Sequence, residues 1–67
     1  MDVVLNGEKN VLPDGTTVAA LLQRLGIEPG RVAVEVNLAV LKRAQHATTA
    51  LKDGDQVEIV QAIGGGA

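Results

Sequence analysis

Only one segment of this 67-residue chain has the apolar spacing of an amphipathic helix. Four apolar residues recur at i, i+3, i+4 and i+7 and so share one helical stripe: Val18, Leu21, Leu22 and Leu25. Thr16 or Thr17 can cap the first turn, and Gly26 can end the helix in the left-handed conformation, with Ile27 packing back on Leu22. A single helix covers one face of one sheet, so the rest of the chain must supply that sheet.

Strand patterns lie on both sides of this helix. Residues 3–5 and 11–12 flank Asn6-Gly7, which readily supplies the positive φ of a hairpin turn. Valines at alternate positions of residues 32–36 indicate a strand with one buried face, and residues 40–42 indicate a short partner strand. Residues 44–50 have no clear period and predict a loop with a brief helical turn. The Asp53-Gly54 turn then leads into a last strand from Val57.

The order of these elements is strand, strand, helix and three further strands. It predicts an α+β fold, a ubiquitin-like β-grasp in which a mixed four- to five-stranded sheet packs on one helix. We expect the first and last strands to run parallel in the middle of the sheet. The expected core is aliphatic: Val3, Leu5, Val18, Leu21, Leu22, Leu25, Val34, Leu51, Val57 and Ile59.

Composition argues against several classes of function. The chain has no aromatic residue and a net charge of −2, so we expect no nucleic-acid partner. It lacks Ser, Cys and Tyr, so we expect neither enzyme activity, nor catalytic residues, nor a bound cofactor. Charged residues interrupt any signal-peptide core, and the longest apolar run, residues 18–22, is too short to span a bilayer. We therefore expect a cytoplasmic protein without a membrane partner.

Three polar residues, His46, Asp53 and Asp55, are of types that can bind metal ions, but their sequence context does not predict a metal site. His46 has no suitable partner close by in sequence, so we expect a solvated loop residue rather than a ligand or base. Asp53 and Asp55 lack the remaining oxygen ligands of a calcium loop, and both favour turns. We therefore predict no metal site.

Three consecutive glycines, Gly64, Gly65 and Gly66, follow the last predicted strand and precede Ala67. On position alone they are either a frayed terminus or a tail without side chains that enters a narrow channel in a partner. Three extended residues reach about 10 Å at ~3.3–3.6 Å each, enough to separate a folded body from a buried reaction centre.

A family resemblance extends over nearly the whole chain. It is carried by residues 3–7, Thr17-Val18, Leu21-Leu22, residues 34–37, residues 47–60 and Ile63-Gly64-Gly65-Gly66. In these motifs the chain resembles the ThiS family of sulfur carriers in thiamine biosynthesis, part of the wider ThiS/MoaD group. The resemblance implies a β-grasp domain over residues 1–63 and a flexible C-terminal glycine tail over residues 64–67.

The resemblance also implies a protein substrate rather than an enzyme. A ThiF-like, E1-type activating enzyme would use ATP and Mg to adenylate the carboxylate of Gly66. Sulfur from a cysteine desulfurase or another source would convert the adenylate to a thiocarboxylate, and a ThiG-like thiazole synthase would accept that sulfur. Ala67 lies beyond the family's Gly-Gly end, so we expect it to leave before activation. Leu38 occupies a turn position where many relatives have glycine.

We expect a partner-binding surface beside the tail, formed by Val60, Ala62 and Ile63. Val60 and Ala62 lie on the face of the last predicted strand opposite to Val57 and Ile59, and exposed apolar patches tend to mark partner sites.

Two other functions remain open at this stage. The chain could be the small subunit of molybdopterin synthase or another thiocarboxylate donor. It could also be a ubiquitin-like binding module whose tail is incidental. Trimming the tail distinguishes a carrier from a module, because only the carrier becomes inert.

Overall fold

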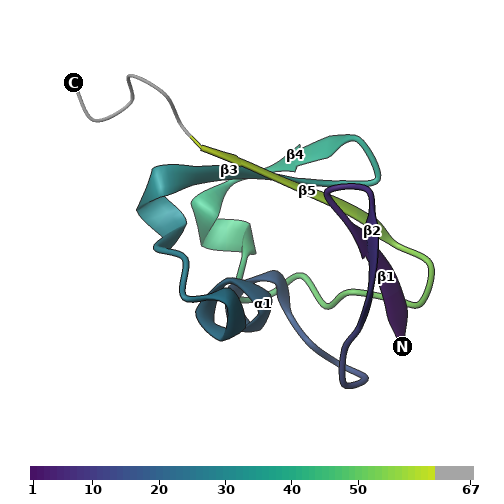
Figure 1. Ribbon diagram of the computed structural model, residues 1–67. Coiled ribbons are helices and arrows are strands. Elements are labelled where there is room, and N and C mark those ends of the chain that lie inside the picture. The colour runs from purple at the N-terminus through teal and green to yellow at the C-terminus, as the bar shows by residue number, and fades with distance from the viewer. Residues whose placement is uncertain (62–67) are drawn as a thin grey trace.

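The computed structural model describes residues 1–61 as a five-stranded sheet with one α-helix packed on it (Figure 1). The elements are, in chain order, β1 (Asp2–Leu5), β2 (Glu8–Val11), α1 (Val18–Leu25), η1 (Pro29–Arg31), β3 (Val32–Val36), β4 (Ala39–Leu41), η2 (Arg43–Gln45) and β5 (Gln56–Gln61). The sheet order is β2-β1-β5-β3-β4, and β1 runs parallel to β5. The other strand pairs are antiparallel. This is the β-grasp that the order of the sequence patterns predicted.

Local signals set both ends of α1. The hydroxyl oxygen of Thr17 accepts a hydrogen bond from the Ala20 N–H at 3.1 Å, which satisfies a donor that the first turn leaves free. At the other end Gly26 has φ 71°, and the Ile27 N–H donates to the Leu22 carbonyl at 2.9 Å. This Schellman closure reverses the chain and confirms the capping prediction.

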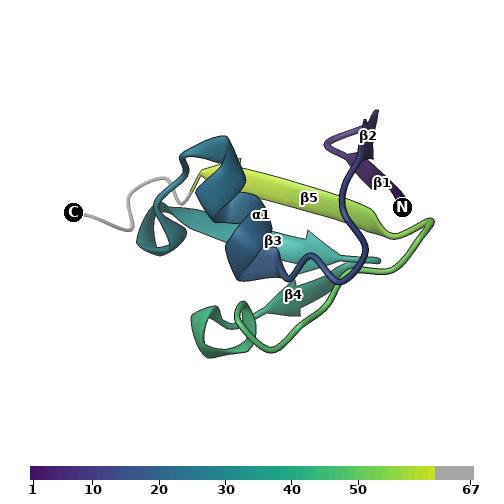
Figure 2. The ribbon, with the colours of Figure 1, turned by 90° about the horizontal axis from the view of Figure 1, so that it is seen from below.

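The core lies between the sheet and α1, which crosses over β3 and β5 in the view of Figure 2. Its buried members are Val3, Leu12, Val18, Leu21, Leu22, Val34, Leu51 and Val57. Leu5 and Ile59 were also predicted to belong to the core, and both are partly buried and packed against this cluster. Leu12 was not among the predicted core residues. The sequence pattern placed residues 11–12 in a strand, whereas β2 ends at Val11 and Leu12 is buried just after it.

The prediction that Leu25 belongs to the core is wrong, because this side chain is 43% exposed. Leu25 is the last residue of α1, and the reversal at Gly26 brings the next apolar residue, Ile27, against the core in its place. The spacing of apolar residues predicts which side chains share one face of a helix. It does not show which of them extend beyond the sheet that the helix packs against.

No helix among residues 1–61 has the length and apolar character needed to cross a membrane.

Candidate functional site

The central strand β5 leads to the glycine-rich C-terminal residues and is held on both edges. Two of its residues pair with β1, through Val4 opposite Gln56 and Leu5 opposite Val57. On the other edge β3 pairs with β5 over five residue pairs and ends with Val32 opposite Gln61. The sheet therefore supports β5 along its length up to the last described residue.

The side chain of Asn6 extends the support on the β1 edge. Its Oδ1 accepts a hydrogen bond from the Ile59 N–H at 2.8 Å, and its Nδ2 donates to the Ile59 carbonyl at 3.3 Å. The backbone of Asn6 also donates to the Val57 carbonyl at 2.9 Å. The side-chain amide of Asn6 thus replaces a backbone peptide group in the pairing with β5. It does so at Ile59, two residues beyond the last β1–β5 pair, which is Leu5 opposite Val57.

A second asparagine holds the opposite end of β5. Asn37 donates its backbone N–H to the Gln56 carbonyl at 2.7 Å, and its Oδ1 accepts from the Gln56 N–H at 2.9 Å. Its Nδ2 donates to a carboxylate oxygen of Asp55 at 3.0 Å. Both asparagines stand in turns at positive φ, 48° for Asn6 and 51° for Asn37, a conformation that asparagine tolerates better than most residues.

The carboxylates of Asp53 and Asp55 hold the turn before β5. An oxygen of Asp53 accepts from the Asp2 N–H at 2.7 Å, and an oxygen of Asp55 accepts from the Lys52 N–H at 2.8 Å. The two side chains act as turn residues, as the sequence indicated. Within residues 1–61 no group of three or more His, Asp or Glu residues could hold a metal ion.

One face of the sheet is turned away from α1 (Figure 1). Val60, the described part of the predicted partner surface, lies on this face because it alternates along β5 with the core-facing Val57 and Ile59. Val60 is 52% exposed there, next to Ala33 on β3. The other two residues assigned to this surface, Ala62 and Ile63, lie outside the described residues. The glycines Gly64, Gly65 and Gly66 and the expected boundary after residue 63 lie outside them as well.

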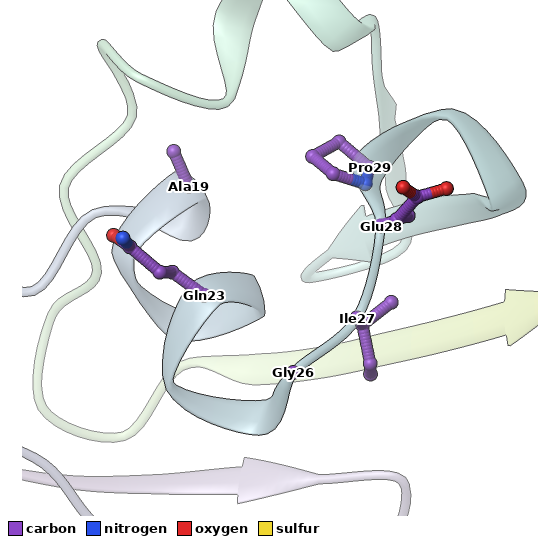
Figure 3. A pocket seen from close by; sticks show the side chains of 6 residues that line it. All are labelled: Ala19, Gln23, Gly26, Ile27, Glu28 and Pro29. Atoms are coloured by element: carbon purple, nitrogen blue, oxygen red, sulfur yellow. The ribbon is translucent and has the colours of Figure 1, made fainter.

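A hollow of about 430 Å³ lies beside the end of α1, and no sequence pattern predicted it (Figure 3). Ala19 and Gln23 of α1 line one side, and Gly26 and the next three residues line the other. A neighbouring hollow shares Gly26, Ile27 and Glu28 and extends to Gln61 at the end of β5. Both hollows border Gly26, where α1 ends and the chain reverses.

The expectation that His46 is a solvated loop residue is wrong, because only 4% of it is exposed. Its carbonyl accepts a hydrogen bond from the Ala19 N–H in the first turn of α1 at 2.9 Å, so η2 is fixed against the helix. The Nδ1 atom is buried and has no hydrogen-bond partner among the described residues. The burial comes from a contact between segments more than twenty residues apart, which local patterns could not reveal.

The chain is similar to known proteins over nearly its whole length. A model of the ThiS family matches residues 2–66. A thiazole synthase of Paramagnetospirillum magneticum is 46% identical over 66 residues, which are 98% of this chain and 20% of that protein. The chain therefore spans about a fifth of the length of this relative.

Two further relatives have nearly the same length as this chain. The sulfur carrier protein ThiS of Escherichia coli K12 is 32% identical over 98% of this chain and 100% of that protein. The crystal structure of the thiamine biosynthesis protein ThiS from Geobacter metallireducens superposes with a TM-score of 0.86. It is 33% identical and covers 96% of this chain and 97% of that chain.

Proposed function

The chain belongs to the ThiS family, and we propose that it is a sulfur carrier protein of thiamine biosynthesis. The observation that carries the proposal is the extent of the family match, which runs through all three glycines and ends at Gly66. In this proposal residues 1–63 form the folded body, residues 64–67 form the tail, and the protein acts in the cytoplasm.

Gly66 supplies the reactive carboxylate in the proposed cycle. A ThiF-like activating enzyme transfers the AMP group of ATP to that carboxylate and releases pyrophosphate, with Mg²⁺ neutralising the phosphates. The adenylate makes the acyl carbon electrophilic because AMP is a good leaving group. Attack by a persulfide sulfur, supplied by a cysteine desulfurase or another source, expels AMP and forms an acyl disulfide. A thiol then reduces the S–S bond and leaves the thiocarboxylate on Gly66.

Thiazole synthase is the proposed acceptor of this sulfur. The proposal is supported by the relative of that name, which is 46% identical to this chain over 66 residues. A tail of glycines suits both transfers, because a backbone without side chains fits a narrow channel and reaches about 10 Å over three residues. The carrier itself contributes no catalytic group in this scheme.

Pyrophosphate release tests the proposal and the role of Ala67 together. The full-length chain and a chain ending at Gly66 are each given ATP, Mg²⁺ and the activating enzyme from the same organism. We expect rapid release from the shorter chain alone, because Ala67 displaces the terminal acyl carbon by roughly 3.5 Å from the adenylating centre. Intact mass after addition of the sulfur source should show one oxygen replaced by sulfur.

Two outcomes would contradict parts of this scheme. Equal release from both chains would show that Ala67 is tolerated and would remove the reason for assigning the reactive carboxylate to Gly66. No release from either chain would favour the ubiquitin-like binding module. A thiocarboxylate that molybdopterin synthase accepts and thiazole synthase refuses would favour the other branch of the ThiS/MoaD group.

A further inference from the structure

The backbone of residues 46–49 completes the first turn of α1. The Val18 N–H donates to the Thr49 carbonyl at 3.0 Å, and the Ala19 N–H donates to the His46 carbonyl at 2.9 Å. Both donors are among the N–H groups that a helix leaves without a partner at its N-terminal end. The start of α1 therefore depends on a segment that lies between β4 and β5 in the chain.

The side chain of His46 is buried at this contact. Only 4% of the residue is exposed, and its Nδ1 atom has no hydrogen-bond partner among residues 1–61. Both ring nitrogens of an imidazolium carry a proton, so a protonated ring would add a charge and a donor at Nδ1 that no described group accepts. The buried position therefore suits a neutral ring and is unfavourable for an imidazolium.

Helix α1 supplies no group that would stabilise a positive charge on His46. Its first turn carries no acidic residue, and its one charged residue is Arg24 in the last turn. The N-terminal end of a helix is itself electropositive, because the dipoles of its peptide groups add along the axis. Residues 47–50, which follow His46, are uncharged as well. A cation at His46 would therefore meet the positive end of the helix.

The short helix η2, which precedes His46, contributes positive groups. Lys42 is its N-cap and Arg43 is its first residue. The guanidinium of Arg43 lies against η1, where Arg31 is paired with Glu28 at 3.3 Å. None of the ion pairs among residues 1–61 includes His46. Protonation of the buried ring would thus add a charge to a region that already holds like charges.

We propose that His46 is a proton-controlled latch that joins residues 46–49 to the start of α1. With a neutral ring the latch is closed and the first turn of the helix is capped. Proton uptake favours the state in which the ring is exposed to water, and that state frees the N–H groups of Val18 and Ala19. The sheet can stay intact, because β1, β3 and β5 pair with one another and not with this segment. The inference depends on the fold and not on the proposed function.

The stability of the full chain should fall as the pH drops, which urea titration measures. The pKa of an exposed histidine is about 6.5, so below that pH the unfolded chain binds a proton that the folded chain excludes. We expect the equilibrium constant for unfolding to rise up to about 25-fold between pH 7 and pH 5, with stability retained above that range.

His46→Gln and His46→Phe are the matched controls, because neither side chain takes up a proton. The chain has one histidine, so the difference between the unaltered chain and these variants reports on His46 alone. Carboxylates titrate mainly below pH 5, so each variant should change its unfolding constant less than about threefold over the same range. The ratio between the two pH values is compared, and a variant that is less stable at both still serves.

Hydrogen exchange of the unaltered chain separates release of the latch from global unfolding. The protection of the Ala19 N–H, corrected for the intrinsic exchange rate at each pH, should fall more steeply below pH 6.5 than that of the Asn6 N–H, which bonds to the Val57 carbonyl. An equal fall at both amides would overturn the inference, as would the same pH dependence of unfolding in the unaltered chain and the variants. If neither variant folds, an unfolding constant of the unaltered chain that stays the same from pH 7 to pH 5 would overturn it.

Discussion

At the scale of single residues, the side chains of two turn asparagines form hydrogen bonds to the backbone of β5 that extend the pairing of the strands. The side chain of Asn6 bonds to both backbone groups of Ile59, and Asn37 bonds to the backbone of Gln56. Each turn places its asparagine at positive φ, where the amide faces β5. The residue after Asn6 is Gly7, and glycine adopts its φ of 83° without steric cost. The residue after Asn37 is Leu38, which has a side chain and must adopt a φ of 71°.

Leu38 is therefore expected to cost stability. Its Cβ crowds the backbone in the left-handed conformation, at roughly 1–2 kcal/mol, and with 85% of the residue exposed it gains little from packing. We predict that Leu38→Gly raises the free energy of unfolding by about 0.5–1 kcal/mol after the entropy cost of glycine is subtracted. Urea titration measures this change.

Leu38→Ala is the matched control for this prediction. Alanine keeps the Cβ and removes the exposed isobutyl group, so its stability should remain close to that of the unaltered chain. A gain as large as that of glycine would show that the exposed side chain, and not the backbone conformation, carries the cost.

At the scale of elements, the apolar stripe along α1 is longer than the part of it that is buried. Val18, Leu21 and Leu22 are buried against the sheet, while Leu25 at the end of α1 lies partly in solvent. The Schellman closure supplies Ile27 in its place. The helix contributes to the core through Val18, Leu21 and Leu22, and Ile27 adds to the core after the reversal.

Two alanine variants test this division of α1. Leu22→Ala should lower the free energy of unfolding by about 2–5 kcal/mol, since Leu22 is fully buried and its removal leaves a cavity. Leu25→Ala, the same change one turn later, should cost less than about 1 kcal/mol because much of that side chain is already in water. Similar losses for both variants in urea titration would contradict the structure at the end of the helix.

At the scale of the whole molecule, the sheet divides the protein into a packed face and an open one. Strand β5 lies in the middle of the sheet and contributes to both faces, because Val57 points into the core and Val60 points away from α1. The strand that holds the fold together is thus also the strand that leads to Gly66. In the proposed function, an enzyme that binds the open face of β5 is placed next to the tail.

One polar substitution on each face of β5 tests this division. Val60→Asn should leave the melting temperature nearly unchanged and weaken binding to the activating enzyme, because it removes an exposed apolar contact without adding charge. Val57→Asn should unfold much of the protein, because it buries an amide without partners. Undiminished affinity of the Val60 variant would remove Val60 from the predicted partner-binding surface.

Local chemistry made several features predictable from sequence. The spacing of apolar residues located α1, the capping residues Thr17 and Gly26 placed its ends, and the Asn6-Gly7 turn placed the first hairpin. Each depends on residues a few positions apart, whose preferred dihedral angles and hydrogen bonds act over a single turn. The glycines at 64–66 and the family resemblance likewise needed no coordinates, and the family match confirmed that resemblance.

Which residues meet across the sheet and over the helix depends on contacts between segments that are distant in sequence. Leu12 and His46 are buried by contacts from distant segments. Glu35 and Glu58 are 23 positions apart in sequence and become neighbours solely through the register of β3 on β5. Strand register depends on how all five strands and α1 pack together, so the charge pair on the open face could not be read from either strand alone.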